Sequence, residues 1–354
     1  MTNYIIRRLL IMPLILFGVT ALIFGMLQFL SPEERSALYV RDIPKNEYAM
    51  AGIIKRYGLD DPIYLQYWHW LVGKEDPISG ETVGGLLRGE FGYSRSASEP
   101  VVDLIKRRFP ATVELALYSI IPIILIGVYM GIAAAVNHNK LIDQVARVFA
   151  ILGHSLPSFI FALLMLMIFY AKLGWFPPGR VSDWATRVIL SPQWNAYTKL
   201  ITVDSLLNGR VDIFLDALRH LVLPVIVLST ISWATYLRVT RSSMLETLRQ
   251  EYVVTARAKG LKEKDVINGH ARPNALIPVA TLGGFTVAAL LGGAVLTETV
   301  FNFPGIGQAA GEAAAQLDVI AVLAFTLLSG LILIVANLVV DVMYAFLAPR
   351  VRLD

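Results

Sequence analysis

The chain has 354 residues, of which 56% are hydrophobic, and its mean hydropathy is +0.60. Because these values exceed what the core of a water-soluble domain requires, they predict a protein that crosses the membrane several times. The absence of cysteine excludes a disulfide framework, a cysteine-ligated metal and thiol chemistry. The formal net charge of +4 is small against 31 Lys and Arg, so the distribution of charge is more informative than its sum.

The N-terminal segment, residues 1–30, is predicted to be the first transmembrane helix. Arg7 and Arg8 precede an apolar run from Leu9 to Leu30. A cleaved signal peptide is the alternative, but the run is about twice as long as the usual apolar core of such a peptide. No small-residue cleavage site follows the run. We therefore expect the segment to remain in the membrane.

Residues 31–110 are predicted to form a small folded cap outside the membrane. The segment combines many turn residues, scattered charges and an aromatic cluster between Tyr64 and Trp70. This composition differs from that of a disordered linker. Trp68, His69 and Trp70 fit an interfacial belt or the core of the cap better than a ligand-binding site, which is the alternative.

Five further apolar runs are each close to or above the ~20 residues that cross ~30 Å of hydrocarbon. They are residues 111–136, 145–171, 221–237, 275–296 and 319–347. Together with the first run they predict an all-α membrane protein with six transmembrane helices, in which residues 111–347 form the core of five. An even number of spans places both termini on one side of the membrane.

The basic residues indicate which side is cytoplasmic. Eight Lys and Arg lie from Arg238 to Arg272, and pairs of basic residues occur near both termini. The opposite side carries most of its basic residues in the first long loop, which is too long for the positive-inside rule to count. We therefore expect the loop 238–274, the N-terminus and the tail 348–354 to be cytoplasmic.

The second outside loop, residues 173–220, is longer than a six-helix core requires and is predicted to be an insertion. Its segment 174–180 (GWFPPGR) is close to a phosphate-binding loop, but Arg180 and Val181 replace the required Lys and Ser or Thr, and no strand precedes it. The sequence has no other Walker motif, no His-Glu-x-x-His and no Gly-x-Ser-x-Gly. We therefore expect no ATPase or hydrolase activity from the chain itself.

Polar and small residues within the spans have structural and functional interpretations. A charge at the membrane centre costs about 2.5–3.5 kcal/mol on insertion scales. Glu114, His154 and Asp341 are therefore expected to form interhelical hydrogen bonds or to lie at an interface, with a proton relay or a substrate contact as the alternative. Gly127 and Gly131 form a G-x-x-x-G pair that predicts close helix packing, either static or moving.

The polar, strongly basic segment between the fourth and fifth spans is predicted to be a lever-like loop. Two short helices are expected, residues 251–259 and 262–272, with Gly260 between them as a left-handed helix stop. Tyr252, Ala256 and Gly260 recur every four residues, which predicts a shared face with small residues. The alternative is a loop that is basic only because cytoplasmic loops usually are.

A turn-rich segment follows the fifth span on the outer side, and it contains Glu298, Phe301, Pro304, Gly305 and Gly307. The pair Pro304-Gly305 is predicted to form a turn that folds a short re-entrant piece over the mouth of a pore. Gating is the functional interpretation of this segment, and a simple tight turn is the alternative.

Several of these segments resemble the membrane subunits of bacterial binding-protein-dependent ABC importers, in particular the dipeptide and oligopeptide (peptide/nickel) branch. The loop motif of that family (Glu-Ala-Ala, three residues, Gly, nine residues, Ile, one residue, Leu-Pro) matches Ala256, Gly260 and Pro273 at the correct spacing. Four positions depart from it, namely Val254, Thr255, His270 and Arg272. The run Tyr252 to Leu261 is typical of the peptide branch. Further similar segments are residues 58–67, 86–94, 110–115, 298–307 and 337–352.

The resemblance implies a bacterial or archaeal cell-membrane location and three kinds of partner. They are a second, homologous permease subunit, two cytoplasmic subunits that bind ATP and Mg, and an extracytoplasmic solute-binding protein. It also implies that the lever docks on an ATPase, with small residues seated in a groove and basic residues paired with charges. The implied coupling residues are Tyr252, Ala256, Arg257, Lys259, Gly260, Leu261 and Pro273. No cofactor, metal or nucleic acid is expected on this chain.

The resemblance implies di- or oligopeptides as the solute, although members of the branch also carry oligosaccharides or nickel, and no residue of this chain decides among them. Two other classes of function are the alternatives. A membrane-embedded enzyme requires ionisable residues that converge within the spans. A channel or a secondary transporter requires more intramembrane charge or paired inverted repeats, and the sequence shows neither.

Overall fold

The computed structural model describes residues 2–36, 39–40, 46–76 and 80–347, and helices dominate this part of the chain. The prediction of a mostly helical protein is therefore confirmed. The strands that it contains are two residues long and form two antiparallel hairpins in the cap. These are β1 (Lys74–Glu75) with β2 (Thr82–Val83), and β3 (Tyr93–Ser94) with β4 (Glu99–Pro100).

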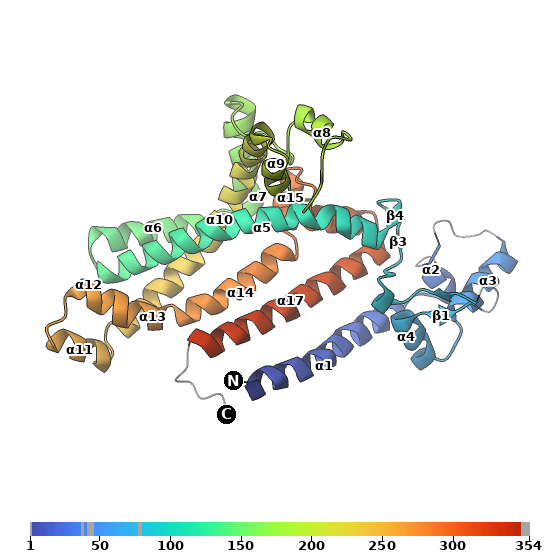
Figure 1. Cartoon of the computed structure of the whole chain (residues 1–354), viewed down its shortest axis with the longest axis horizontal. Coiled ribbons are helices and arrows are strands. Elements are labelled where there is room, and N and C mark those ends of the chain that lie inside the picture. Colours follow the sequence, from blue (N-terminus) through green and yellow to red (C-terminus); the bar gives the residue numbers. More distant parts are fainter. Residues whose placement is uncertain (1, 37–38, 41–45, 77–79, 348–354) are drawn as a thin grey trace.

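Long apolar helices run along the molecule (Figure 1). They are α1 (Thr2–Leu27), α5 (Val101–Val136), α10 (Val211–Thr247) and α17 (Val319–Leu347). Segments of α1, α5 and α17 are long and apolar enough to cross a membrane without a break. Two bent pairs also qualify when each is taken as one span. The first joins α6 (Leu141–Ser155) to α7 (Ser158–Met165) and the π-helical η2 (Leu166–Lys172), and the second leads into α14 (Ile277–Leu291). Several membrane-compatible helices are thus confirmed, and the count of six remains a prediction.

Two of these elements differ from the predicted runs. The helix α5 begins at Val101 rather than at Ala111, because its charged first turns continue the helix beyond the apolar stretch. The predicted run 145–171 is divided, because Leu156 has the extended backbone (φ −100°, ψ 131°) that the following Pro157 favours. Hydropathy alone detects neither feature, since it reports apolar length and not the path of the backbone.

The shorter elements lie in three places (Figure 1). The cap holds α2 (Pro32–Ser36), α3 (Glu47–Tyr57), α4 (Ile63–Val72) and η1 (Leu86–Arg88). The insertion holds α8 (Asp183–Ile189) and α9 (Ile201–Leu207), and α10 already begins within its predicted range. The opposite end from the cap holds α11 (Glu251–Ala258), α12 (Glu263–Asp265), the π-helical η3 (Val266–Ala271) and α13 (Arg272–Ala275). Between α14 and α17 lie α15 (Val295–Val300) and α16 (Ile306–Ala315).

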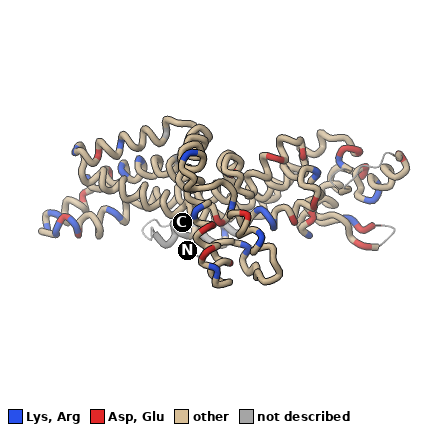
Figure 2. Tube along the Cα trace, turned by 90° about the horizontal axis from the view of Figure 1, so that it is seen from above, with Lys and Arg blue, Asp and Glu red and all other residues tan. Residues whose placement is uncertain are grey.

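Charged residues lie mainly at the ends of the molecule and in the insertion (Figure 2). Lys and Arg outnumber Asp and Glu around α11–α13, and charges of both signs also occur in the cap and the insertion. In Figure 1, α1 begins and α17 ends toward the α11–α13 side of the molecule. The predicted tail, residues 348–354, lies outside the described residues.

The cap is attached to the long helices by an apolar cluster and one carboxylate. Leu27, Leu104 and Phe325 bring α1, α5 and α17 together, and Trp70 of α4 packs against them. Asp318 precedes α17 and accepts hydrogen bonds from Ser94 Oγ at 2.7 Å, Ser96 N at 3.0 Å and Ala321 N at 3.2 Å. Asp318 therefore caps α17 and holds the β3–β4 hairpin against its first turn.

The helices α5 and α10 pack closely along their length, and the predicted glycine pair lies at their contact. A Cβ added to Gly131 would lie 2.6 Å from Thr240 Cβ and 2.9 Å from Leu237 O. Gly127 similarly faces Tyr236, one turn away. Both glycines thus allow the two backbones to approach, as small residues do at interfaces of membrane helices.

The substitution Gly131→Ala is expected to destabilise the chain by about 1–3 kcal/mol, the usual cost of overpacking. Gly283→Ala is the matched control, because its Cβ would meet only Tyr236 Oη at 4.0 Å. Thermal unfolding of both variants in detergent, followed by circular dichroism, measures the difference. Equal melting temperatures would show that the α5–α10 contact tolerates a methyl group.

Candidate functional site

The basic segment after α10 is the first of three candidate functional regions. The helix α11 ends where Gly260 adopts φ +80°, and the chain continues through α12 and η3 into α13. Gly260 is therefore the left-handed stop that its position predicted. A Cβ at Gly260 would meet nothing within 4 Å. The glycine is thus required for its backbone conformation and not for close packing.

The inner face of α11 packs onto the ends of two long helices. Val253 is fully buried and Ala256 is 6% exposed, and both belong to a cluster with Ala135 of α5, Met244 of α10 and Val266 of η3. Because close-packed side chains transmit displacement, α11 cannot move without moving or unpacking these neighbours. The loop is therefore mechanically attached to α5 and α10.

The side of the α11–α13 loop opposite this cluster is exposed and partly apolar. Tyr252 is 43% exposed and Leu261 is 44% exposed, and Lys259, Gly260 and Pro273 are also at the surface. The three residues that were predicted to share a face therefore differ in exposure: Tyr252 and Gly260 are exposed, whereas Ala256 is buried. Ala256 points inward because it follows Val253 by three residues and shares its buried side.

Arg257 pairs within the loop. Its Nε and NH2 groups donate to Glu263 Oε2 at 3.0 Å and Oε1 at 2.7 Å, and NH1 donates to Leu248 O at 3.3 Å. The hydrogen bonds from Arg257 hold the pKa of Glu263 below its usual value. Because both side chains are exposed, the pair contributes little to stability, but it spans the Gly260 turn. The sequence reasoning had not identified Glu263 as this partner.

The second region is the turn between α15 and α16, called the outer turn after its predicted side of the membrane, and it surrounds a buried carboxylate. Glu298 is fully buried; its Oε1 accepts from Thr112 Oγ1 at 3.1 Å and from Ala294 N at 3.2 Å, and its Oε2 accepts from Gln308 N at 2.9 Å. Thr112 Oγ1 itself accepts from Ile306 N at 2.8 Å. Since Ile306 and Gln308 begin α16, Glu298 and Thr112 satisfy otherwise free N–H groups of that helix.

The predicted glycines make room for this carboxylate. A Cβ on Gly305 would lie 2.5 Å from Thr112 Oγ1, and one on Gly307 would lie 2.9 Å from Glu298 Oε2. Glu298, Gly305 and Gly307 therefore come together around the Pro304 turn that joins α15 to α16. Phe301 is 1% exposed and packs in a separate cluster under α7 and α10. A role in gating stays a prediction.

Burial raises the pKa of Glu298 above its ordinary value. The hydrogen bonds from Gln308, Ala294 and Thr112 favour the charged form and oppose part of this rise. The carboxylate is therefore poised between the cost of burial and the stabilisation by three donors.

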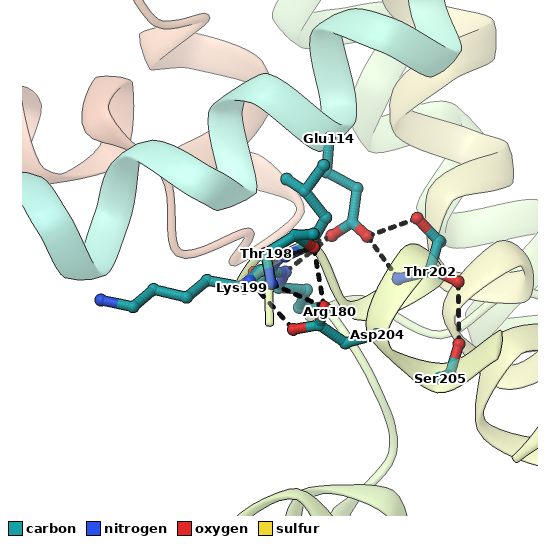
Figure 3. A network of polar contacts seen from close by, with 8 residues as sticks. Glu114, Arg180, Thr198, Lys199, Thr202, Asp204 and Ser205 are labelled. Carbon is teal, nitrogen blue, oxygen red and sulfur yellow. Dashed lines mark hydrogen bonds and ion pairs between the residues drawn. The ribbon is translucent and has the colours of Figure 1, made fainter. Parts of the chain in front are cut away.

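The third region is the attachment of the insertion to α5. Glu114 is 1% exposed; its Oε2 accepts from Arg180 Nε at 2.9 Å, and its Oε1 accepts from Thr202 N at 2.6 Å and Oγ1 at 2.7 Å (Figure 3). Arg180 also donates to Lys199 O at 2.9 Å. Glu114 was expected to form an interhelical hydrogen bond or to lie at an interface, and the partners that it has belong to the insertion. Arg180, which breaks the phosphate-loop pattern, thus has a structural role.

Further contacts order the insertion. Asp204 is 1% exposed and accepts from Thr198 N at 2.8 Å and Lys199 N at 2.9 Å (Figure 3). Asp216 of α10 accepts from both the N and the Oγ of Ser182 at 2.7 Å. In addition, Gly179 N donates to the backbone oxygen of Phe301 at 2.7 Å. The insertion is therefore attached to α5, to α10 and to the outer turn.

Two predicted polar positions remain without a structural account. The side chains of His154 and Asp341 lie outside what the structure describes, so their expected hydrogen bonds stay predictions. Among the described residues, no group of three or more His, Asp or Glu side chains is arranged to hold a metal ion.

An apolar groove of about 770 Å³ lies between α5, α14 and α17. Aliphatic side chains from all three helices line it, including Val128, Val279 and Val335. Arg272 reaches its edge, where the guanidinium lies 5.8 Å from the centre of the Tyr129 ring. The groove suits an apolar group better than a charged one.

Comparison with known proteins identifies relatives over nearly the whole chain. Residues 123–353 match the family model described as the inner membrane component of binding-protein-dependent transport systems, and residues 1–116 match the model for the N-terminal part of such membrane components.

Individual relatives cover the full length of this chain. It is 38% identical over 352 residues to a di/tripeptide transport system permease protein, DppB, of Pseudomonas aeruginosa, with 99% of each chain covered. It is 35% identical to an oligopeptide transport system permease protein, AppB, of Bacillus subtilis, with 99% of this chain and 100% of AppB covered. It is 34% identical to a dipeptide transport system permease protein, DppB, of Escherichia coli, with 99% of each covered.

The substitution Glu298→Gln is expected to flatten the dependence of stability on pH. The raised pKa of Glu298 means that the folded chain holds this proton more tightly than the unfolded chain does. Its contribution to stability is therefore full below the unfolded pKa of about 4.3 and is lost as the pH rises through the folded pKa. Melting temperatures measured in detergent from pH 4 to 8 should fall more for the unmodified chain than for the variant. Glu312→Gln, at an exposed carboxylate of the next helix, α16, is the control. Parallel curves for the unmodified chain and both variants would contradict the assignment.

The substitution Glu114→Gln is expected to loosen the insertion, since breaking a buried ion pair costs about 3–5 kcal/mol. Asp212→Asn is the control in the same region, because solvent screens the exposed Arg210–Asp212 pair and it contributes little to stability. Limited proteolysis within residues 173–210, together with the melting temperature, measures the effect. Cleavage at the same rate in both variants would mean that Glu114 does not hold the insertion in place.

Proposed function

Because the chain belongs to the family of inner membrane components of binding-protein-dependent transport systems, we propose that it is a permease subunit of an ATP-driven ABC importer for di- or oligopeptides. The proposal is supported by relatives named as peptide permeases that match over 99% of the chain. The chain supplies the membrane path, and partner subunits hydrolyse the ATP.

The proposed arrangement has six spans, formed by α1, α5, the α6–α7 pair, α10, α14 and α17. The segment Leu221–Leu237 of α10 contains no charged residue and continues into flanking helical turns. The loop 238–274 and both termini lie in the cytoplasm, while the cap, the insertion and the α15–α16 turn lie outside. The concentration of Lys and Arg around α11–α13 supports this orientation (Figure 2).

The loop α11–α13 is the proposed coupling element. Its outer residues, including Tyr252, Lys259, Gly260 and Leu261, dock on one of two cytoplasmic subunits that bind ATP and Mg. The observation that supports this role most directly is the cluster of Val253 and Ala256 with the ends of α5 and α10. A movement of the docked loop then displaces both helices, which switches the path between inward-facing and outward-facing states.

The outer turn and the insertion are the proposed outward side of the path. The α15–α16 turn is attached through Glu298 and Thr112 to α5, which is one of the two helices that the loop moves. The path is completed by a second, homologous permease subunit, and an extracytoplasmic binding protein delivers the solute. The turn thus follows α5 when the importer changes state.

The proposal is tested on the assembled complex in lipid. We expect its ATPase activity to rise when the binding protein is loaded with a peptide mixture, and not when it is offered oligosaccharides or nickel. Stimulation by oligosaccharides or nickel would show that the importer carries that solute instead of peptides. Failure of the chain to assemble with any ATP-binding subunit would overturn the importer assignment.

The substitution Gly260→Leu is expected to uncouple transport. A left-handed backbone costs a non-glycine residue about 1–2 kcal/mol, and the new side chain would project from the docking face. Solute-stimulated ATPase activity should fall by about tenfold, within the range of common coupling energies. Gly209→Leu is the matched control, since Gly209 also has positive φ (+68°) and open surroundings but lies in the insertion. Both variants should reach the membrane in normal amounts, and unchanged transport by Gly260→Leu would count against the lever.

A further inference from the structure

A pocket between α6 and α10 carries an excess of positive charge. It has a volume of about 490 Å³, and three arginines, Arg147, Arg238 and Arg241, line it together with Ser155. Its apolar wall includes Ala150 and Leu237. None of these residues belongs to α11–α13, to the outer turn or to the insertion described above. The pocket therefore needs an explanation of its own.

The carboxylate beside this pocket, that of Asp143, already accepts hydrogen bonds from within the chain. Asp143 is fully buried, and its Oδ1 accepts from Arg241 Nε at 2.6 Å while its Oδ2 accepts from Arg241 NH2 at 2.9 Å and Asn139 N at 3.0 Å. Arg147 reaches the same carboxylate only at 3.7 Å and is 49% exposed. Among the described side chains, no ion pair is formed by Arg238, which is exposed. The exposed guanidinium groups of Arg147 and Arg238 thus retain donors for a ligand.

The depth of the arginines matches the headgroup layer of a bilayer. Arg147 lies six residues after the start of α6 and Arg241 six residues before the end of α10, which at 1.5 Å per residue is about 9 Å from each helix end. The polar layer on one side of a membrane is about 5–8 Å thick. In the proposed arrangement, in which the uncharged segment of α10 ends at Leu237, the arginines lie near the level where lipid phosphates meet the hydrocarbon.

The surface next to the pocket is apolar. On α6, Val148 is 54% exposed, Ile151 is 65% exposed and Leu152 is 61% exposed. Acyl chains bury an apolar surface of this kind favourably, whereas a soluble anion gains no stabilisation from it. Guanidinium groups bind phosphate through paired N–H donors, and basic pockets between helices on the cytoplasmic side suit anionic lipid headgroups.

We propose that Arg147, Arg238 and Arg241 bind the phosphate of an anionic membrane phospholipid, whose acyl chains lie along the exposed face of α6. Asp143 orients Arg241, and Arg147 and Arg238 supply the free donors. The site depends on the chain lying in the membrane and is independent of the solute and of ATPase coupling.

Native mass spectrometry of the full chain, purified in detergent, tests the site. The measured quantity is the binding constant of the first phosphatidylglycerol molecule, with phosphatidylcholine for comparison and inorganic phosphate as a competitor. Arg147→Gln and Arg238→Gln should each weaken phosphatidylglycerol binding by about fivefold, the value of one basic residue near an anionic membrane surface. The double substitution to Lys should retain most of the binding. Arg249→Gln, at an exposed arginine outside the pocket, is the matched control and should change nothing.

The outcomes separate lipid from other ligands. Equal weakening by Arg249→Gln would show that only overall charge matters and would overturn the site. Displacement of the lipid by millimolar inorganic phosphate would assign the pocket to a soluble anion. Unchanged binding in the Arg147→Gln/Arg238→Gln double variant would also overturn the proposal. These two side chains are exposed, so their replacement leaves the fold intact and keeps the result interpretable.

Discussion

The close packing of α5 on α10 is the contact on which the rest of the structure depends. Gly127 and Gly131 allow the two backbones to approach, and α5 extends to both sides of this contact. Thr112 and Glu114 in its N-terminal half hold the turn and the insertion, while Ala135 near its C-terminal end joins the cluster beneath the loop. One helix of 36 residues therefore links every candidate region.

Buried carboxylates hold the insertion, the α15–α16 turn and the β3–β4 hairpin in place. Glu114, Glu298 and Asp318 each accept hydrogen bonds from segments that are distant in sequence or that begin a helix. The cost of removing a carboxylate from water is offset only when several donors converge on it, so each of these positions specifies one arrangement of its surroundings. The exposed Arg257–Glu263 pair differs, because solvent screens it and it orders only its own turn.

The two sides of α11 have different surroundings. Its buried residues share a close-packed cluster with the long helices, while Tyr252 on α11 and Leu261 just after it are exposed and available for the proposed docking. This division suits a lever, which needs a firm connection on one side and a free surface on the other. The arginine pocket lies between α6 and α10, so a bound lipid would stabilise the contact between these two helices from the membrane side.

Local patterns determined the helical class, the bounds of α17, the stop at Gly260 and the resemblance to a transport family, because apolar runs and short motifs depend on neighbouring residues. They did not reveal that Ala256 turns inward, that α5 begins at Val101, or that Arg257 pairs with Glu263. The partners of Glu114 lie 66 and 88 residues away, and those of Thr112 lie 186 and 194 residues away. Such contacts exist only after the chain has folded, because it is the packing of α5 that brings donors and acceptors within reach.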